Sequence, residues 1–139
     1  MVDIIFSANN NAEVMVLPIV PPDIQISEPQ DNEDFDGING KLKLIGNMGL
    51  RTMTIESFFP VGKDYSFIRP GSIKDGWQYV EFFRRWRAAK VPIRVIITTK
   101  DSAKRLNMAC VVNDFSWAVD KVGDIKYTLE IEEYKFVTG

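Results

Sequence analysis

Apolar and polar residues alternate along most of this chain, and that pattern predicts β-strands with one buried face. Glycine, proline and asparagine separate the alternating runs and mark turns between them. The predicted strands cover residues 3–8, 12–17, 23–28, 41–46, 50–59, 92–99, 105–119 and 124–136. We expect residues 9–11 (Asn-Asn-Asn) to form the loop of one hairpin and residues 47–49 (Asn-Met-Gly) the loop of another.

The two longest predicted strands change parity before they end. In residues 105–119 the apolar positions are first even and then odd. The even set is Leu106, Met108, Cys110 and Val112, and the odd set is Phe115, Trp117 and Val119. In residues 124–136 the alternation breaks at Glu133, and Tyr134 and Phe136 take the opposite parity. Such a change indicates a β-bulge or a sharp bend, so we expect two strands that bend together in a barrel or a sandwich.

One helix is predicted, over residues 74–90, because aromatic and apolar residues recur there at spacings of three and four. Asp75 can cap its start and Pro92 ends it. We expect three of its aromatic side chains to lie in the core; they are Trp77, Phe83 and Trp86. The predicted fold class is therefore α+β and mainly β, a tube-like barrel or sandwich of bent antiparallel strands with one flanking helix.

An acidic segment follows the third predicted strand. Its carboxylates are Glu28, Asp31, Glu33, Asp34 and Asp36, and two glycines come next. So polar and glycine-rich a segment is predicted to be an exposed loop. A calcium loop would be the functional alternative, but the spacing does not follow the EF-hand pattern and no closing glutamate occupies its twelfth position.

Basic residues crowd the end of the predicted helix and the strand after it. They are Arg84, Arg85, Arg87, Lys90, Arg94, Lys100, Lys104 and Arg105. Next to helical aromatics, they could form a surface for single-stranded nucleic acid. We favour a solvated helix end beside core aromatics, because the net charge is −2, the pI is about 5.2 and no known nucleic-acid motif is present.

The chemistry available to the chain is narrow. Its 139 residues predict a single domain, 1–139, and contain no histidine, which removes the usual general base and the commonest metal ligand. The single cysteine, Cys110, shares the parity of apolar neighbours and is expected to be buried. We therefore expect no enzyme, no cofactor and no metal site; an enzyme that uses carboxylates, with or without a metal, is the third-ranked alternative. The sequence also shows neither a membrane span nor a signal peptide.

Several stretches, taken in order, resemble a known family. They are residues 23–46, 55–60, 79–98 and 122–136. The most specific pieces are Phe58-Phe59-Pro60, the helix exit from Trp86 to Arg94, and Gly123-Asp124-Ile125 with Tyr134 beyond it. Over residues 12–137 the chain resembles the N-terminal domain of LysM-bearing baseplate hub proteins of PBSX-type prophages, and of related contractile phage tails and tail-like bacteriocins.

The resemblance implies a structural protein at the junction of tail tube and baseplate. It would assemble in the bacterial cytoplasm into a homo-oligomeric, hexameric ring, with tube, hub or spike and wedge proteins as neighbours, and with neither membrane nor sequence-specific nucleic acid as partner. Family members often continue into a LysM module, whereas this chain stops at Gly139. We expect that module to be absent or supplied by another chain, and no cell-wall binding is carried over.

Opposite charges on two segments suggest where subunits touch. The expected contacts are Asp31, Glu33, Asp34 and Asp36 in the acidic segment and Arg84, Arg85 and Arg87 on the helix. They could meet within one chain or join neighbours head to tail in a ring, and the sequence leaves both arrangements open. The alternative function is a small β-barrel that binds single-stranded nucleic acid.

Overall fold

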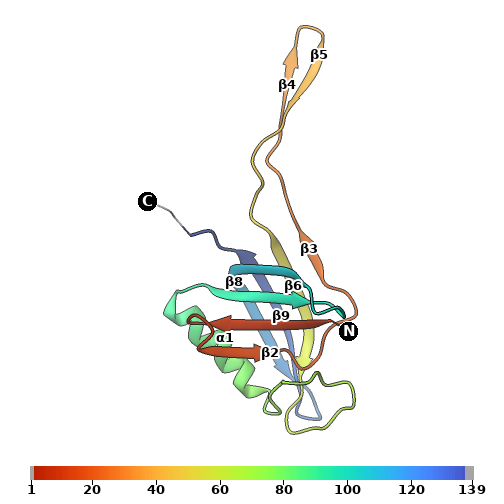
Figure 1. Cartoon of the computed structure of the whole chain (residues 1–139), viewed down its shortest axis with the longest axis vertical. Coiled ribbons are helices and arrows are strands. Elements are labelled where there is room, and N and C mark those ends of the chain that lie inside the picture. The colour runs from red at the N-terminus through yellow and green to blue at the C-terminus, as the bar shows by residue number, and fades with distance from the viewer. Residues whose placement is uncertain (1, 137–139) are drawn as a thin grey trace.

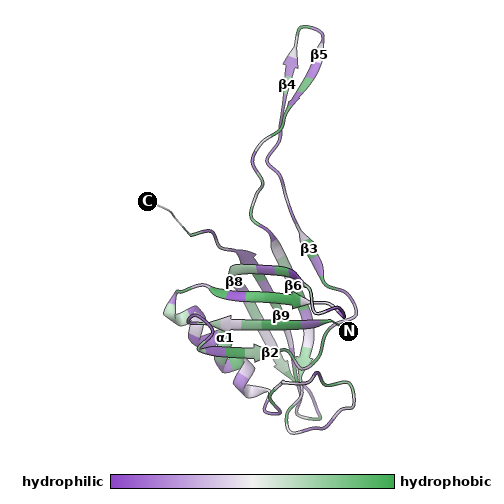
Figure 2. Cartoon of the chain, in the orientation of Figure 1, coloured by the Kyte–Doolittle hydropathy of each residue, from purple (hydrophilic) through white to green (hydrophobic). Residues whose placement is uncertain are grey.

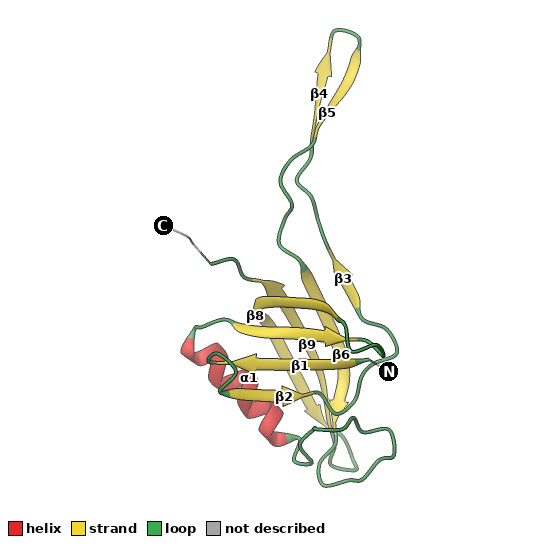
Figure 3. Cartoon of the chain, in the orientation of Figure 1, coloured by secondary structure: helices red, strands yellow, loops and turns green. Residues whose placement is uncertain are grey.

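The computed structural model describes residues 2–136, which form one large antiparallel sheet, one helix and a separate hairpin (Figures 1 and 3). The elements are β1 (Asp3–Ala8), β2 (Glu13–Val16), β3 (Gln25–Ser27), β4 (Glu33–Gly37), β5 (Gly40–Leu44), β6 (Thr52–Phe59), α1 (Trp77–Ala89), β7 (Ile93–Thr98), β8 (Lys104–Val119) and β9 (Ile125–Glu133). Seven strands make the large sheet in the order β2-β1-β7-β8-β9-β6-β3, and β4 pairs only with β5. The predicted class, mainly β with one helix, is confirmed.

The large sheet is rolled, and a short connection joins its two edge strands. Only residues 17–24 join β2 at one edge to β3 at the other. Within this connection, Leu17 N–H donates to the Ile4 carbonyl on β1 (2.9 Å). Ser57 Oγ, on β6, donates to the Ile19 carbonyl (3.3 Å). The connection thus bridges both sides of a barrel-like sheet whose edge strands share no ladder.

The helix covers the concave, apolar face of the sheet. Four of its side chains are buried: Tyr79, Val80, Phe82 and Phe83. Phe83 meets Phe6 edge-on with ring centroids 5.1 Å apart, and Phe59 is stacked between Tyr79 (4.9 Å) and Tyr127 (3.9 Å). Aromatic packing therefore holds α1 to strands from both halves of the sheet.

The predicted core needs one correction at the start of the helix. Phe83 is buried and Trp86 is partly buried, but the Trp77 side chain is 37% exposed, so its prediction as core was wrong. Trp77 lies on the first turn and packs edge-on against Trp117, which is itself 38% exposed. Cys110 is buried as predicted, and burial raises the pKa of its thiol to about 12.

The helix is shorter than predicted, beginning at Trp77 and ending at Ala89. Asp75 does lie at its start: its carboxylate accepts a hydrogen bond from the Trp77 backbone N–H (3.1 Å). At the other end Lys90 adopts a left-handed conformation (φ 58°), which turns the chain toward Pro92 and β7. No helix in the described part of the chain is long and apolar enough to cross a membrane.

The parity change in β8 is a β-bulge, as predicted. Val112 pairs with Ile131 and Asp114 with Glu130, so Asn113 is an extra residue with no partner on β9. The extra residue lets apolar side chains on both sides of the bulge point to the core face. The second parity change has another cause, because β9 ends at Glu133 and does not continue to residue 136.

Residues 28–51 form a projecting arm, and here the sequence prediction was wrong twice. The acidic segment is not a loop throughout, because residues 33–37 are strand β4. Residues 41–46 and 50–59 do not form a hairpin together, because β5 pairs with β4 whereas β6 pairs with β3 and β9. Figure 1 shows the β4–β5 hairpin standing away from the rolled sheet on two extended legs.

Candidate interaction site: the projecting arm

The hairpin at the end of the arm has two chemically different faces. Asp34 lies opposite Lys43, with an ion pair of 3.1 Å, and Asp36 lies opposite Lys41, so the charges of one face match across the strands. On the other face Phe35 lies opposite Leu42, and Glu33 lies opposite Leu44. Since directly paired residues share a face, this second face is apolar apart from the Glu33 carboxylate.

The apolar face of the hairpin is uncovered. Exposed fractions are 44% for Phe35, 52% for Leu42 and 54% for Leu44, and Ile38 at the tip is fully exposed. Figure 2 shows hydrophobic residues interspersed along the arm far from the body of the molecule. An isolated two-stranded hairpin is at best marginally stable in water, so this arrangement is typical of a segment that docks on a partner.

The two legs of the arm are tied together below the hairpin. Asp31 N–H donates to the Asn47 carbonyl (2.8 Å), and Gly49 N–H donates to the Pro29 carbonyl (2.8 Å). Gly46 is required by close approach, because a Cβ at this position would lie 1.5 Å from the Asp31 carbonyl oxygen. The legs therefore act as a pair of extended strands held by a few hydrogen bonds.

The base of the arm is anchored to the end of β9 through Arg51 and Glu133. The Arg51 guanidinium donates to both carboxylate oxygens of Glu133, from Nε at 3.3 Å and from Nη2 at 3.0 Å. The hydrogen bond from Arg51 lowers the pKa of Glu133, outweighing burial, which raises it. Glu28, on the other leg, lies 3.8 Å from the same guanidinium. Both legs thus meet one cation at the rim of the sheet.

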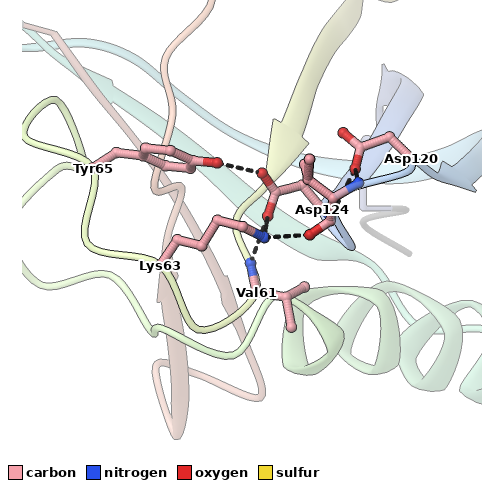
Figure 4. Close-up of polar contacts among 6 residues, drawn as sticks. Val61, Lys63, Tyr65, Asp120 and Asp124 are labelled. Atoms are coloured by element: carbon pink, nitrogen blue, oxygen red, sulfur yellow. Dashed lines mark hydrogen bonds and ion pairs between the residues drawn. The ribbon is translucent and has the colours of Figure 1, made fainter.

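A second polar cluster fixes the loop between β6 and α1. The buried Asp124 carboxylate accepts hydrogen bonds from Lys63 Nζ (2.7 Å), Tyr65 Oη (2.7 Å) and the Val61 backbone N–H (3.1 Å), as Figure 4 shows. Burial raises the pKa of Asp124, but the bonds from Lys63 and Tyr65 outweigh it and hold that pKa below its usual range. Because every donor points at the carboxylate, the cluster is a structural clasp between this loop and the turn before β9.

The predicted charged contacts do not meet within one chain. The acidic residues lie along the arm, and Figure 1 shows the arm projecting away from the end of the molecule where α1 lies. On the helix, Arg84 pairs with Glu81 (3.5 Å) and Arg85 with Glu13 (2.6 Å). Of the arrangements left open by the sequence, contact inside one subunit is therefore not observed.

The structure adds little support for the two alternative functions, a surface for single-stranded nucleic acid and an enzyme that uses carboxylates. Arg105 pairs with Asp101 (2.8 Å) and Arg94 donates to the Asn107 side chain (2.8 Å), so the basic residues are spread over the helix and over strands β7 and β8. Among residues 2–136, no three cysteine, aspartate or glutamate side chains are grouped so that they could hold a metal ion. Binding of single-stranded nucleic acid stays an untested prediction.

Solved structures with the same fold come from virus-like particles. No protein-family model matches the sequence, and no curated protein matches it. One similar chain belongs to the tail of an empty gene transfer agent (GTA) particle with C6 symmetry; it is 12% identical, with a TM-score of 0.63 over 98% of this chain and 93% of the other. A second belongs to the virion of a native GTA particle, with 12% identity and a TM-score of 0.61 over 96% of this chain and 92% of the other.

This chain has the fold of a GTA particle protein. The likeness spans nearly the whole of each chain, so the arm, the helix and the rolled sheet all fall within it. The narrower relation to LysM-bearing hub proteins stays a prediction.

Sequence reasoning missed the feature that defines the candidate site, the apolar face of the β4–β5 hairpin. The apolar face of the hairpin was hidden because only Phe35 is apolar in β4, while Leu42 and Leu44 were assigned to a different hairpin. A usable signal was present: residues 33–37 and 40–44 alternate around the two-residue loop Ile38-Asn39, flanked by Gly37 and Gly40.

Proposed function

We propose that this protein is a structural subunit of a phage-tail-like particle and assembles with copies of itself into a hexameric ring at the tube–baseplate junction. The uncovered apolar face of the arm carries this proposal, because nothing within the described residues 2–136 covers it and exposed apolar surface of this kind is typical of an interaction site. The shared fold with a chain of a C6-symmetric GTA tail supports it. Tube, hub or spike and wedge proteins are the expected neighbours, as the sequence resemblance implies.

The mechanism is geometric and needs no chemical step. The arm and the body are different surfaces, so a contact between the arm of one subunit and the body of the next is head-to-tail. Repeated contacts of this kind close a ring when the rotation between subunits permits it. Buried apolar area supplies the free energy of association, and charge sets the orientation.

The predicted charged contacts divide into two groups by their present partners. Asp34 and Asp36 face lysines across the hairpin, and Arg84 and Arg85 have glutamate partners. Asp31, Glu33 and Arg87 form no ion pair within residues 2–136. We propose that the latter three contribute most to contacts between subunits, while the others steer association.

Deletion of the coding sequence in the bacterium that carries it tests this function. We expect electron microscopy of the induced lysate to show that tails are missing or lack a baseplate, and that the wild-type chain supplied in trans restores them. A body in which residues 30–48 are replaced by a short glycine linker should fold but fail to restore tails. Intact tails in normal numbers from the deletion strain would overturn the proposal.

A further inference from the structure

A groove of about 400 Å³ opens between the end of α1 and β8, beside the bulge. Its lining residues are Trp86, Arg87, Lys90, Val91, Ile93, Cys110, Val111 and Val112. The floor is apolar, and two cations stand at the helix end. Such a site fits an apolar side chain accompanied by a carboxylate.

The groove contains a hydrogen-bond donor without a partner. Trp86 Nε1 is buried and donates to no atom of the described residues 2–136. Leaving such a donor unsatisfied is unfavourable, so an external acceptor is expected. The same indole lines the groove, so a partner that enters the groove lies against this ring and changes the surroundings of its N–H group.

The cations at the groove differ from their neighbours on the helix. Arg84 and Arg85 are paired with Glu81 and Glu13, respectively. Arg87 and Lys90 pair with no carboxylate in the described part of the chain. The groove is therefore positive at its rim, and its charge is available to a partner.

We propose that the groove receives the arm of a second copy of this chain, with Phe35 on the apolar floor and the Glu33 carboxylate beside Arg87 and Lys90. This inference rests on the proposed function and names the surface that the arm uses. Glu33 and Phe35 are two residues apart on one strand and lie on the same face, about 7 Å from each other. This spacing lets the phenyl group of Phe35 lie on the apolar floor while the Glu33 carboxylate lies at the positively charged rim.

The arm that fills the groove must come from another subunit. The Arg51–Glu133 contacts fix the base of the arm at the end of β9, and the arm projects away from α1 (Figure 1). The arm and the groove are distinct surfaces, so their contact is head-to-tail and repeats from one copy to the next.

Nuclear magnetic resonance of the indole N–H groups tests the inference on the full chain. The chain has three tryptophans, Trp77, Trp86 and Trp117, and each gives one indole signal. A ¹⁵N-labelled Phe35→Asp chain keeps its groove but has a disabled arm, and it is titrated with unlabelled wild-type chain. We expect the Trp86 signal to shift while the other two stay, and unlabelled Phe35→Asp chain to cause no shift.

Charge reversal supplies the matched controls. A labelled Phe35→Asp chain that also carries Arg87→Glu should bind the wild-type chain at least tenfold more weakly. When unlabelled Glu33→Lys chain is added to this double variant, the two charges are exchanged, so the Trp86 signal should shift again. Arg84→Glu in place of Arg87→Glu reverses a neighbouring arginine that lies outside the groove and is paired with Glu81, so it should weaken binding much less than Arg87→Glu does. Three results would overturn the inference. The chain could self-associate without a shift of the Trp86 signal, or it could fail to self-associate at all. Arg84→Glu could also weaken binding as much as Arg87→Glu does.

The groove and the proposed function can fail separately. If deletion of the gene abolishes tails but the Arg87→Glu chain restores them, the function stands and the assigned groove is wrong. If the deletion strain makes normal tails, the proposed function is wrong whatever the resonance experiment shows.

Discussion

The carboxylate of Glu133, the last residue of β9, holds the guanidinium of Arg51 at the base of the arm. Arg51 Nη2 lies 3.0 Å from Glu133 Oε2, and the two backbones are joined as well, since Glu133 N–H donates to the Arg51 carbonyl (2.7 Å). Glu133 stands where the alternation of β9 calls for an apolar residue. The break in the sequence pattern therefore marks the point where the sheet stops and the arm is attached.

Neutralising this carboxylate should destabilise the protein. We expect Glu133→Gln to lower the free energy of unfolding by about 1–2 kcal/mol, because a charged, partly buried hydrogen-bond acceptor is lost. Thermal and urea unfolding would measure this. Glu130→Gln, an exposed residue of the same strand, is the matched control and should change little. Equal effects of the two variants would contradict a specific role for the Arg51–Glu133 contact.

Stability should fall in acid because of two carboxylates. The folded-state pKa values of Asp124 and Glu133 are both lowered, so each stabilises the fold above the unfolded carboxyl pKa, near 4. That contribution is lost as the pH falls below about 4 and through the folded values. Melting temperatures followed from neutral pH to about pH 3 should drop, and Asp124→Asn should flatten the curve while lowering its neutral end. An unchanged acid dependence in Asp124→Asn would contradict the assigned role of the clasp.

Two aromatic residues of α1 should respond very differently to truncation. Phe83 is fully buried among Phe6, Phe82 and Phe115, so Phe83→Ala should cost about 3–5 kcal/mol. Trp77 is more than one third exposed, so Trp77→Ala should cost clearly less than Phe83→Ala in the same denaturant unfolding experiment. A larger loss for Trp77→Ala would mean that the first turn of the helix packs more tightly than its exposure indicates.

Deleting one asparagine from β8 should be tolerated at the bulge and not in the regular ladder. Removal of Asn113 shortens β8 by one residue, so Phe115 takes the same parity as Leu106 and Met108. The alternation then continues through the strand, and the core-facing side chains keep their face. Removal of Asn107, which pairs with Ile96, moves its neighbours to the wrong face and should abolish cooperative unfolding. Circular dichroism melts of the two deletion variants compare them directly, and similar melts would contradict the bulge assignment.

The apolar face of the arm should matter for assembly and not for folding. Phe35→Asp should leave the melting temperature of the monomer unchanged, because Phe35 contacts no buried core, yet weaken self-association at least tenfold. Sedimentation velocity over a concentration series would measure the second effect. Val14→Asp is the control, since Val14 is similarly exposed but lies on β2. Equal loss from both variants would point to a non-specific effect of surface charge.

Local patterns in the sequence predicted most strands of the large sheet, but they did not predict the arm. Alternation located β1, β7 and β8, and the parity change between Val112 and Phe115 predicted the bulge that the structure has at Asn113, because each signal depends on one strand and one buried face. The arm depends on pairing between strands, for example of Asp34 with Lys43, and no local pattern says which strand a segment will choose. Arg51–Glu133 was also out of reach, because its partners are 82 residues apart.

The arm also works as a lever. Along its shorter leg, from Glu28 at the base to Ile38 at the tip, it can extend up to about 33 Å, since a strand rises about 3.3 Å per residue. A turn of only about 10° at the base would then swing the tip sideways by roughly 6 Å, about the separation of two residues along a strand. The contacts of the Arg51 guanidinium with Glu133 and Glu28 therefore help to fix the direction in which the arm projects. That direction in turn affects the curvature and diameter of any ring that such subunits build.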